Sequence, residues 1–246
     1  MKFSKPNLPQ GAACLCVVSG GNKQVIRALE QRGVTCYITR PSRALSAPVA
    51  SHADMLALSF KPGALILAAD QRELHARLQK NGVEAVRFDG LKPGYPTETA
   101  LNAAVIGKWL IGGETALFAL KSFETSKLEV LSVRQGYARC SVVPVAENAL
   151  MTADKGIAAA ARGAGLEVLE LQPEPGIQLP GYQHGFLGGC CGKLSASQLA
   201  FCGDFTALAQ HQTIKAFLAR FGVEPVSLIP GPMQDIGGWI VLAEKD

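Results

Sequence analysis

Five short apolar segments of the sequence each begin with a polar or reactive residue. The segments span 52–59, 102–107, 140–145, 184–190 and 235–242, and they begin with His52, Asn102, Cys140, His184 and Asp235. Burying a polar group without a hydrogen-bond partner costs about 2–7 kcal/mol. The pattern therefore predicts either that these residues bond to one another at a shared site or that hydrated strand ends accommodate them separately.

Three of the polar side chains could do chemistry together. If segment 52–59 is a strand, His52 and Asp54 lie two residues apart and face the same side. An imidazole transfers protons at neutral pH, and a carboxylate binds cationic N–H groups. Cys140 is a nucleophile if its thiolate is favoured, but Arg139 beside it would face the opposite side of a strand. The structural alternatives are a hydrogen-bonded histidine at a strand start and a small buried cysteine.

The segment His184–Gly192 combines four glycines with the adjacent Cys190 and Cys191. His184 could donate a proton, and Cys190 or Cys191 could be the reactive thiol in place of Cys140. The alternative is a tightly packed inner strand in which glycine gives room for close backbone approach. The segment lacks the GxxxxGK[ST] spacing of a phosphate-binding loop. Asn102, Tyr182 and Gln183 are predicted polar wall residues.

A strand–helix–strand pattern occurs five times between these segments. Asn22, Asp70, Asp154 and Asp204 are suited to cap helix starts, and Gly33, Gly82, Gly165 and Gly222 are suited to end the helices. The expected helices span 22–31, 70–79, 114–123, 154–162 and 205–220. The expected strands on either side of them span 15–19 and 34–38, 64–69 and 83–88, 109–112 and 128–133, 149–153 and 166–169, and 198–202 and 223–229.

Each apolar segment and the pattern after it form one strand–strand–helix–strand unit. The last unit contains only its first strand, 235–242, and residues 14–39 supply the rest. The sequence therefore predicts a single α/β domain over residues 1–246, a five-bladed α/β propeller of ββαβ units around a central channel. Joining the two chain ends in one unit removes free sheet edges.

This arrangement resembles the pentein fold of the guanidino-group-modifying enzymes. His52-Ala53-Asp54 resembles their His-x-Asp element, and Gln-Gly-Tyr-Ala-Arg-Cys-Ser-Val-Val-Pro resembles their nucleophile segment. With Ser-His-Ala-Asp-Met and Gly-Tyr-Ala-Arg-Cys-Ser, the chain looks most like an uncharacterised bacterial family of this fold.

The resemblance implies a cysteine-dependent hydrolase or amidinotransferase that acts on a small cationic guanidine or amidine through a covalent thiouronium intermediate. Cys140 would be the nucleophile and His52 the proton donor, and Asp54 and Asp235 would hold the guanidinium. Asn102 and His184 are the further candidate substrate-binding residues. No cofactor or metal is expected. The fold also includes a non-catalytic ribosome anti-association factor, so the alternative is a binding module without activity.

The composition of the chain argues against several other classes of function. The chain has 24 basic and 20 acidic residues but no basic block, so nucleic acid is not an expected partner. No apolar run reaches the ~18–20 residues of a membrane span, and no apolar stretch precedes Gly11-Ala12-Ala13-Cys14 to make a signal peptide. The seven cysteines form no CxxC pair, and with four histidines they predict a reducing cytoplasm and no zinc site. The sequence specifies no oligomeric state.

Overall fold

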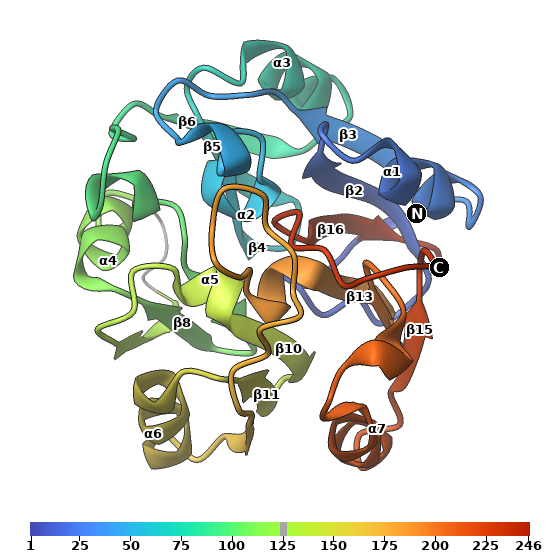
Figure 1. Ribbon diagram of the computed structural model, residues 1–246. Coiled ribbons are helices and arrows are strands. Elements are labelled where there is room, and N and C mark those ends of the chain that lie inside the picture. The colour runs from blue at the N-terminus through green and yellow to red at the C-terminus, as the bar shows by residue number, and fades with distance from the viewer. Residues whose placement is uncertain (124–126) are drawn as a thin grey trace.

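The computed structural model describes residues 1–123 and 127–246. Its strands form five small sheets arranged around a common axis (Figure 1). In each unit the innermost strand pairs antiparallel with the second, the second pairs parallel with the third, and a helix connects the second to the third. The five-bladed ββαβ propeller expected from the repeats is confirmed.

The units follow one another along the chain. The first is β4 (Ala57–Lys61), β5 (Ala64–Ala68), α3 (Arg72–Lys80) and β6 (Glu84–Phe88); the second is β7 (Ala104–Ile106), β8 (Trp109–Gly112), α4 (Glu114–Leu120) and β9 (Glu129–Ser132). The third is β10 (Val142–Ala146), β11 (Ala149–Thr152), α6 (Lys155–Gly163) and β12 (Glu167–Glu170); the fourth is β13 (Cys191–Ser195), β14 (Gln198–Phe201), α7 (His211–Ala219) and β15 (Glu224–Ser227).

The fifth unit joins the two ends of the chain, as the sequence predicts. It consists of β16 (Trp239–Glu244), β2 (Ala13–Ser19), α1 (Lys23–Glu30) and β3 (Thr35–Thr39), with the short β1 (Lys2–Phe3) on the other side of β16. The inner strands contact one another in the order β16, β4, β7, β10, β13 and back to β16, which closes the ring.

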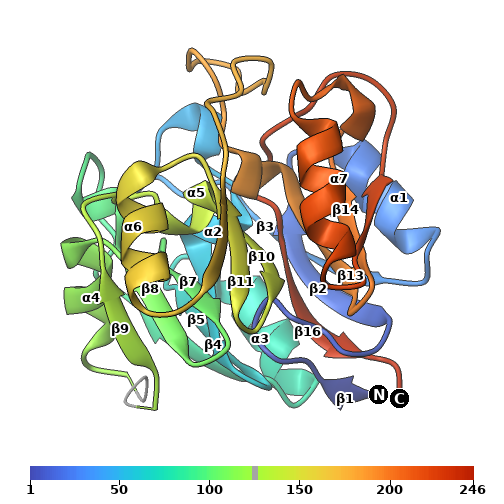
Figure 2. The ribbon, with the colours of Figure 1, turned by 90° about the horizontal axis from the view of Figure 1, so that it is seen from below.

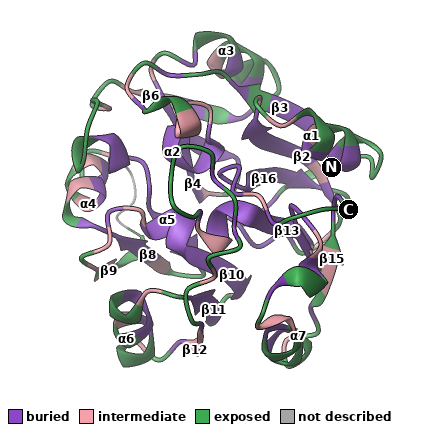
Figure 3. Cartoon of the chain, viewed as in Figure 1, coloured by how far each residue is buried: buried purple, intermediate pink, exposed green. Residues whose placement is uncertain are grey.

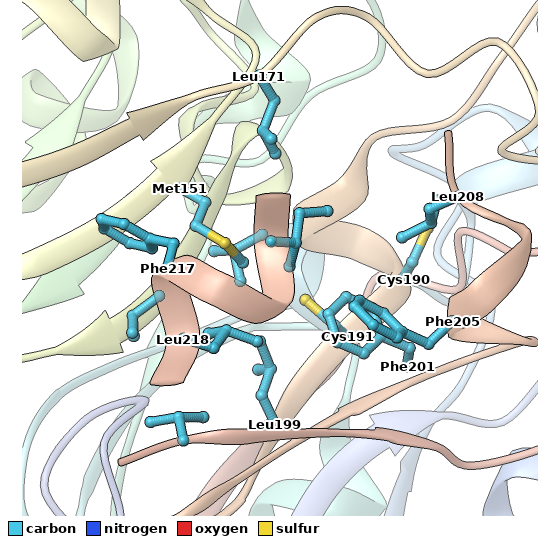
Figure 4. Packing of buried hydrophobic residues seen from close by; sticks show 14 of the residues in the cluster. Met151, Leu171, Cys190, Cys191, Leu199, Phe201, Phe205, Leu208, Phe217 and Leu218 are labelled. Carbon is cyan, nitrogen blue, oxygen red and sulfur yellow. The ribbon is translucent and has the colours of Figure 1, made fainter. Parts of the chain in front are cut away.

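Five hydrophobic clusters hold neighbouring units together. Each cluster combines buried side chains from two adjacent units, and the one between the third and fourth units is shown in Figure 4. All five residues of β5 are buried, whereas the outer helix α3 buries only Leu74 and Leu78 of its nine residues. The molecule is accordingly buried around its axis and exposed along its rim (Figure 3).

The predicted helix ends agree with the structure at most positions. Asn22 and Asp154 cap α1 and α6 by accepting backbone N–H groups. Gly33, Gly82, Gly165 and Gly222 all have positive φ. The capping role of Asp70 is wrong, since Gln71 precedes α3 and its side chain bonds the backbone of Arg40.

The helix expected over 205–220 is also wrong, because it is divided. Asp204 caps the 3₁₀ turn η4 (Phe205–Ala207), and α7 begins only at His211.

Three of the five inner segments contain a helical turn where the strand was expected to start, which corrects a further prediction. The turn α2 (Ala53–Leu56) precedes β4, α5 (Ala138–Ser141) precedes β10, and η3 (Leu187–Cys190) precedes β13. In the third and fourth units the second strand ends opposite the first residue of the inner strand: Val142 pairs with Thr152, and Cys191 pairs with Phe201. Without a strand partner, the backbone satisfies its hydrogen bonds in a local turn.

The helical turns lie at one end of the ring, together with the long segment 171–186 that crosses it (Figures 1 and 2). Both termini lie at the opposite end, where the Met1 amino group is 2.6 Å from Asp246 Oδ2. None of the helices in residues 1–123 and 127–246 has the length and apolarity to cross a membrane.

Candidate active site

A cavity of about 350 Å³ opens at the end of the ring where the helical turns meet. We call it the thiol cavity. Cys140, His52, Asp235 and His184 all belong to its wall. Asp54 and Asn102 are buried next to the Cys140 thiol without belonging to that wall. The remaining lining residues are Val49, Met55, Tyr137, Leu179, Tyr182, Gln183 and Phe186.

The Cys140 thiol has two polar contacts. Its S–H group donates to Asp54 Oδ2 at 3.1 Å, and Asn102 Nδ2 donates to the sulfur at 3.1 Å. Asn102 also fixes the turn that carries the thiol, because its Oδ1 accepts the Arg139 backbone N–H at 2.8 Å. Asn102 therefore positions the thiol without lining the cavity, and the sequence did not indicate this location.

The two carboxylate oxygens of Asp54 differ in their hydrogen bonding. Oδ2 accepts the thiol proton, whereas the buried Oδ1 has no hydrogen-bond partner. Gly237, at φ +76°, leaves the room that this arrangement needs: a Cβ there would lie 2.5 Å from His52 Cβ and 2.7 Å from Asp54 Oδ1. A buried carboxylate oxygen without a donor is costly in the unliganded protein.

Asp235 is held from both sides by backbone N–H groups. Phe186 N donates to Oδ2 at 2.8 Å, and Gly237 N donates to Oδ1 at 3.0 Å. His52 Nδ1 lies 3.8 Å from Oδ1. A Cβ at Gly189 would clash with this carboxylate, so a glycine of the fourth unit makes room for it. Burial raises the pKa of Asp235; His52 opposes this rise, and Asp54 adds to it.

The same environment keeps the thiol protonated. Burial, then the charges of Asp54 and Asp235, raise the pKa of Cys140 well above its usual value. Arg139 does not counteract this, because its Nη1 donates to the carbonyls of Val142 and Gly188. At neutral pH the unliganded site therefore contains a thiol rather than a thiolate.

The other two cysteines of interest face the hydrophobic core. Cys190 donates to the Phe186 carbonyl at 3.1 Å, and Cys191 donates to the Leu187 carbonyl at 3.3 Å. Figure 4 shows both among the apolar side chains between the third and fourth units, with Phe201. Neither lines the thiol cavity. The glycine-rich segment thus matches the tightly packed alternative.

The mouth of the cavity contains the remaining predicted polar residues. His184 is exposed, and its Nδ1 lies 3.2 Å from the Gly185 carbonyl. Tyr182 shares a 2.7 Å hydrogen bond with Ser46 across the opening. Gln183 lies between them in the cavity wall, as predicted.

Sequence reasoning missed the aromatic and apolar walls. Tyr137 and Phe186 line the cavity with ring centroids 6.0 Å apart. The Tyr137 hydroxyl donates to Glu98 at 2.5 Å, and burial together with Glu98 raises its pKa far above its usual value. Tyr137 lies in the motif that identified Cys140 and could have been found from it, whereas nothing in the sequence singled out Glu98.

The described residues, 1–123 and 127–246, contain no cluster of three or more histidine, cysteine, aspartate or glutamate side chains suited to a metal ion. The polar groups of the site are instead arranged around one thiol. Two carboxylates, an imidazole and an amide surround it. That set can bind a cation, carry a covalent intermediate on sulfur and transfer protons.

Comparison with known proteins gives a family and a fold. Residues 17–240 match the model of a family of unknown function, DUF6873. No curated protein matches. Among solved structures, the inosamine-phosphate amidinotransferase of Streptomyces griseus matches with a TM-score of 0.64 and 11% identity, covering 100% of this chain and 98% of that one.

Two further structures show the same fold. An amidinotransferase of Microseira wollei from the saxitoxin biosynthetic pathway matches with a TM-score of 0.58 and 12% identity over 100% of this chain and 98% of that chain. The agmatine deiminase of C. jejuni matches with a TM-score of 0.55 and 9% identity over 93% of this chain and 90% of that chain. At these identities the similarity establishes the fold alone.

Proposed function

The chain belongs to the family of unknown function DUF6873 and has the pentein fold, and from its site we propose that it is a cysteine-dependent enzyme that breaks a C–N bond of a guanidine or amidine. One observation carries the proposal: the Cys140 thiol, bonded to Asp54, shares one cavity with His52 and Asp235. The structural neighbours support it, since they include amidinotransferases and an agmatine deiminase.

A guanidinium group complements the carboxylates of the site in charge and geometry. It is planar, positively charged and carries N–H donors in a fixed fork that matches carboxylates. Asp54 Oδ1 lacks a donor, and Asp235 faces the cavity with both oxygens already oriented by backbone N–H groups. A cation bound beside Asp235 would donate to its oxygens, and the positive charge would relieve the repulsion between the two carboxylates.

The bound cation would also prepare the nucleophile. The charges of Asp54 and Asp235 raise the pKa of Cys140, so a positive charge between them lowers it again. The thiol proton passes to Asp54 Oδ2, which already accepts its hydrogen bond and returns the proton to sulfur later, and the thiolate forms an S–C bond to the central guanidinium carbon. His52 donates a proton to the departing nitrogen as the C–N bond breaks, which leaves a thiouronium on Cys140.

Release of the product reverses these roles. His52 takes a proton from water, the water oxygen attacks the thiouronium carbon, and the S–C bond breaks as sulfur regains a proton. With water the net reaction converts a guanidine into a urea and ammonia or an amine. With an amine as the second nucleophile, the same intermediate gives an amidinotransferase.

The test measures turnover and the covalent intermediate together. We expect the wild-type protein to release ammonia or amine from a panel of guanidines, and acid-quenched protein to carry a thiouronium mass on the peptide containing Cys140. Cys140→Ala should abolish both signals, and Cys14→Ser, far from the cavity, should change neither. The absence of turnover and adduct with every guanidine, amidine and amine acceptor would reject the proposal.

The same site supports a binding module as the second candidate. Cys140 is buried and its pKa is raised, which suits a static hydrogen-bond donor as well as a resting nucleophile. This alternative predicts that guanidines stabilise the fold and that Cys140→Ser retains their affinity, with no adduct in either protein.

A further inference from the structure

A second cavity adjoins the thiol cavity. It has a volume of about 200 Å³, lies between the third and fourth units, and we call it the side cavity. His184 and Phe186 belong to the walls of both cavities. Ser141, the residue after Cys140, lines the side cavity. A ligand bound at Cys140 can therefore extend past His184 and Phe186 toward the side cavity, or past His52 and Asp235 toward a third cavity that shares these two residues with the thiol cavity.

The carboxyl groups in both cavity walls disfavour a negative charge on the ligand. No lysine or arginine lines either cavity in the part of the chain that the structure describes. The walls contain three carboxyl groups, Asp235 in the thiol cavity and Asp154 and Glu174 in the side cavity. Arg139, next to Cys140 in sequence, is committed to two backbone carbonyls. A carboxylate or phosphate on the ligand would be repelled by these carboxyl groups and would find no guanidinium or ammonium partner.

The walls instead provide apolar and aromatic surface. In the thiol cavity, Tyr137 and Phe186 present rings beside Met55 and Leu179. The side cavity is lined on one side by aliphatic side chains from three segments, namely Leu171, Ile177, Leu187, Leu208 and Ile214. Such surfaces gain free energy by removing apolar ligand area from water.

One polar group in the side cavity lacks a partner. Ser141 Oγ is buried and makes no hydrogen bond, although the Ser141 backbone carbonyl accepts one from Thr152. An unpaired buried hydroxyl is unfavourable in the unliganded protein. It would be satisfied by a hydrogen-bonding atom on a ligand that reaches this depth.

The inference from these observations rests on the proposed function and makes its substrate class more specific. We infer that the substrate is a guanidine or amidine whose substituent is uncharged and mainly apolar, and that this substituent extends past His184 and Phe186 into the side cavity. The substrate is thus no amino acid: it carries a cationic head for Asp54 and Asp235, and no carboxylate.

The first experiment compares two ligands that differ in one end group. Butylguanidine and 4-guanidinobutanoate share the guanidinium and a similar chain length, and only the second has a carboxylate. We expect kcat/KM to be at least about tenfold higher for butylguanidine, because like charges are unscreened in a buried site. Equal values, or a preference for 4-guanidinobutanoate or arginine, would overturn the inference and leave the proposed function intact.

The second experiment blocks the side cavity alone. Ala153 is exposed at its edge, so Ala153→Trp fills the cavity without disturbing the core. KM for 4-phenylbutylguanidine should rise about tenfold, while kcat/KM for methylguanidine should stay unchanged. Ala69→Trp is the matched control, because Ala69 precedes Asp70 after β5 as Ala153 precedes Asp154 after β11, and it lines neither cavity.

The outcomes separate the two proposals. Turnover of methylguanidine with no effect of Ala153→Trp on the long substrate contradicts the side-cavity inference only. No turnover and no Cys140 adduct with any guanidine contradicts the proposed function. Ser141→Ala gives an independent measurement: it should lower KM for purely aliphatic guanidines, because it removes a buried unpaired hydroxyl, and unchanged values would argue against a ligand at that depth.

Discussion

Cys140 in the third unit and Cys190 in the fourth both lie in the turn before an inner strand, two residues before β10 and one residue before β13 respectively. Both are buried, and burial raises the pKa of both thiols well above the usual value. Their partners differ. Cys140 bonds to a carboxylate and an amide beside a cavity, whereas Cys190 bonds to a carbonyl of its own turn and packs in the hydrophobic core. A reactive role is therefore indicated by the neighbours of a thiol, and not by its burial or its pKa.

The strongest test of this comparison removes each thiol in turn. Cys140→Ala should lower turnover of a guanidine by about 10³-fold or more, because among the described residues no other cysteine lines the thiol cavity. Cys190→Ala should retain most of the turnover and lower the free energy of unfolding by about 1–2 kcal/mol through a small core cavity. Ammonia release and thermal melting measure the two effects. The reverse pattern would assign the reactive thiol to the fourth unit.

The next largest effect is expected at Asp54. Asp54→Asn keeps the shape of the side chain and removes its charge, so guanidine turnover should fall about 10²-fold as the cation loses a partner. The thermal stabilisation by guanidines should largely disappear as well. In the unliganded variant the pKa of Cys140 should fall, because the Asp54 charge raises it in the wild type.

Alkylation by iodoacetamide between pH 7 and 9 measures that pKa change. Cys140 in the variant should react at lower pH than in the wild type, while Cys190 stays unreactive in both. If the wild-type and variant profiles coincide, the carboxylate does not control the thiol.

The third prediction concerns pH. Asp235 has a raised pKa, and a guanidinium binds to its ionised form. Affinity should therefore be full above this raised pKa and should fall about tenfold per pH unit below it. Calorimetric titration from pH 8 downward measures the loss, and Asp235→Asn should bind weakly at every pH. An affinity that does not change between pH 8 and pH 4 would contradict the assignment.

Asp235 also makes the stability of the fold depend on pH, and this dependence has the opposite sign to that of guanidinium affinity. The native carboxyl of Asp235 binds its proton more tightly than the unfolded chain does, so ionising it above the raised pKa costs stability. Asp235 thus contributes more favourably to the free energy of unfolding as pH falls through that value.

The smallest effect distinguishes the two thiols by charge selection. Chloroacetamidine is cationic and chloroacetamide is neutral, and they are nearly the same size. Cys140 should prefer the amidine several-fold, because Asp54 and Asp235 attract its charge, whereas Cys190, buried in the core, should react with neither reagent. Peptide mass mapping measures the labelling of each cysteine. Cys14 is half-buried, outside the thiol cavity, and serves as the reference.

Much of the fold follows from the sequence because its signals are local. Asn22, Asp154 and the glycines at positive φ mark helix ends by backbone chemistry, and five apolar segments give the units. Asp70 failed as a cap since Gln71 has its own bonds to Arg40. The turns before the inner strands were missed because they depend on where the second strand of each unit ends, which is a property of pairing between segments.

Part of the site could also be predicted, because it follows from the repeated units. The meeting of His52, Asp54, Cys140 and Asp235 follows from their places in the repeated units. The location of Asn102 behind the thiol and the orientation of Cys190 into the core depend on side-chain directions within single helical turns. Tyr137 and Phe186 form a wall only because two separate units place them together.

The pairing of β16 with β2 affects how the molecule folds. This strand pair joins residues more than two hundred positions apart, so its formation requires closure of a loop of that length. Asp235 lies four residues before β16 and reaches His52 only when that strand is in place. A folding intermediate with four formed units would contain Cys140 and Asp54 but no complete cation site. The step that completes the ring thus also completes the site, and a chain that has not finished folding lacks the second carboxylate.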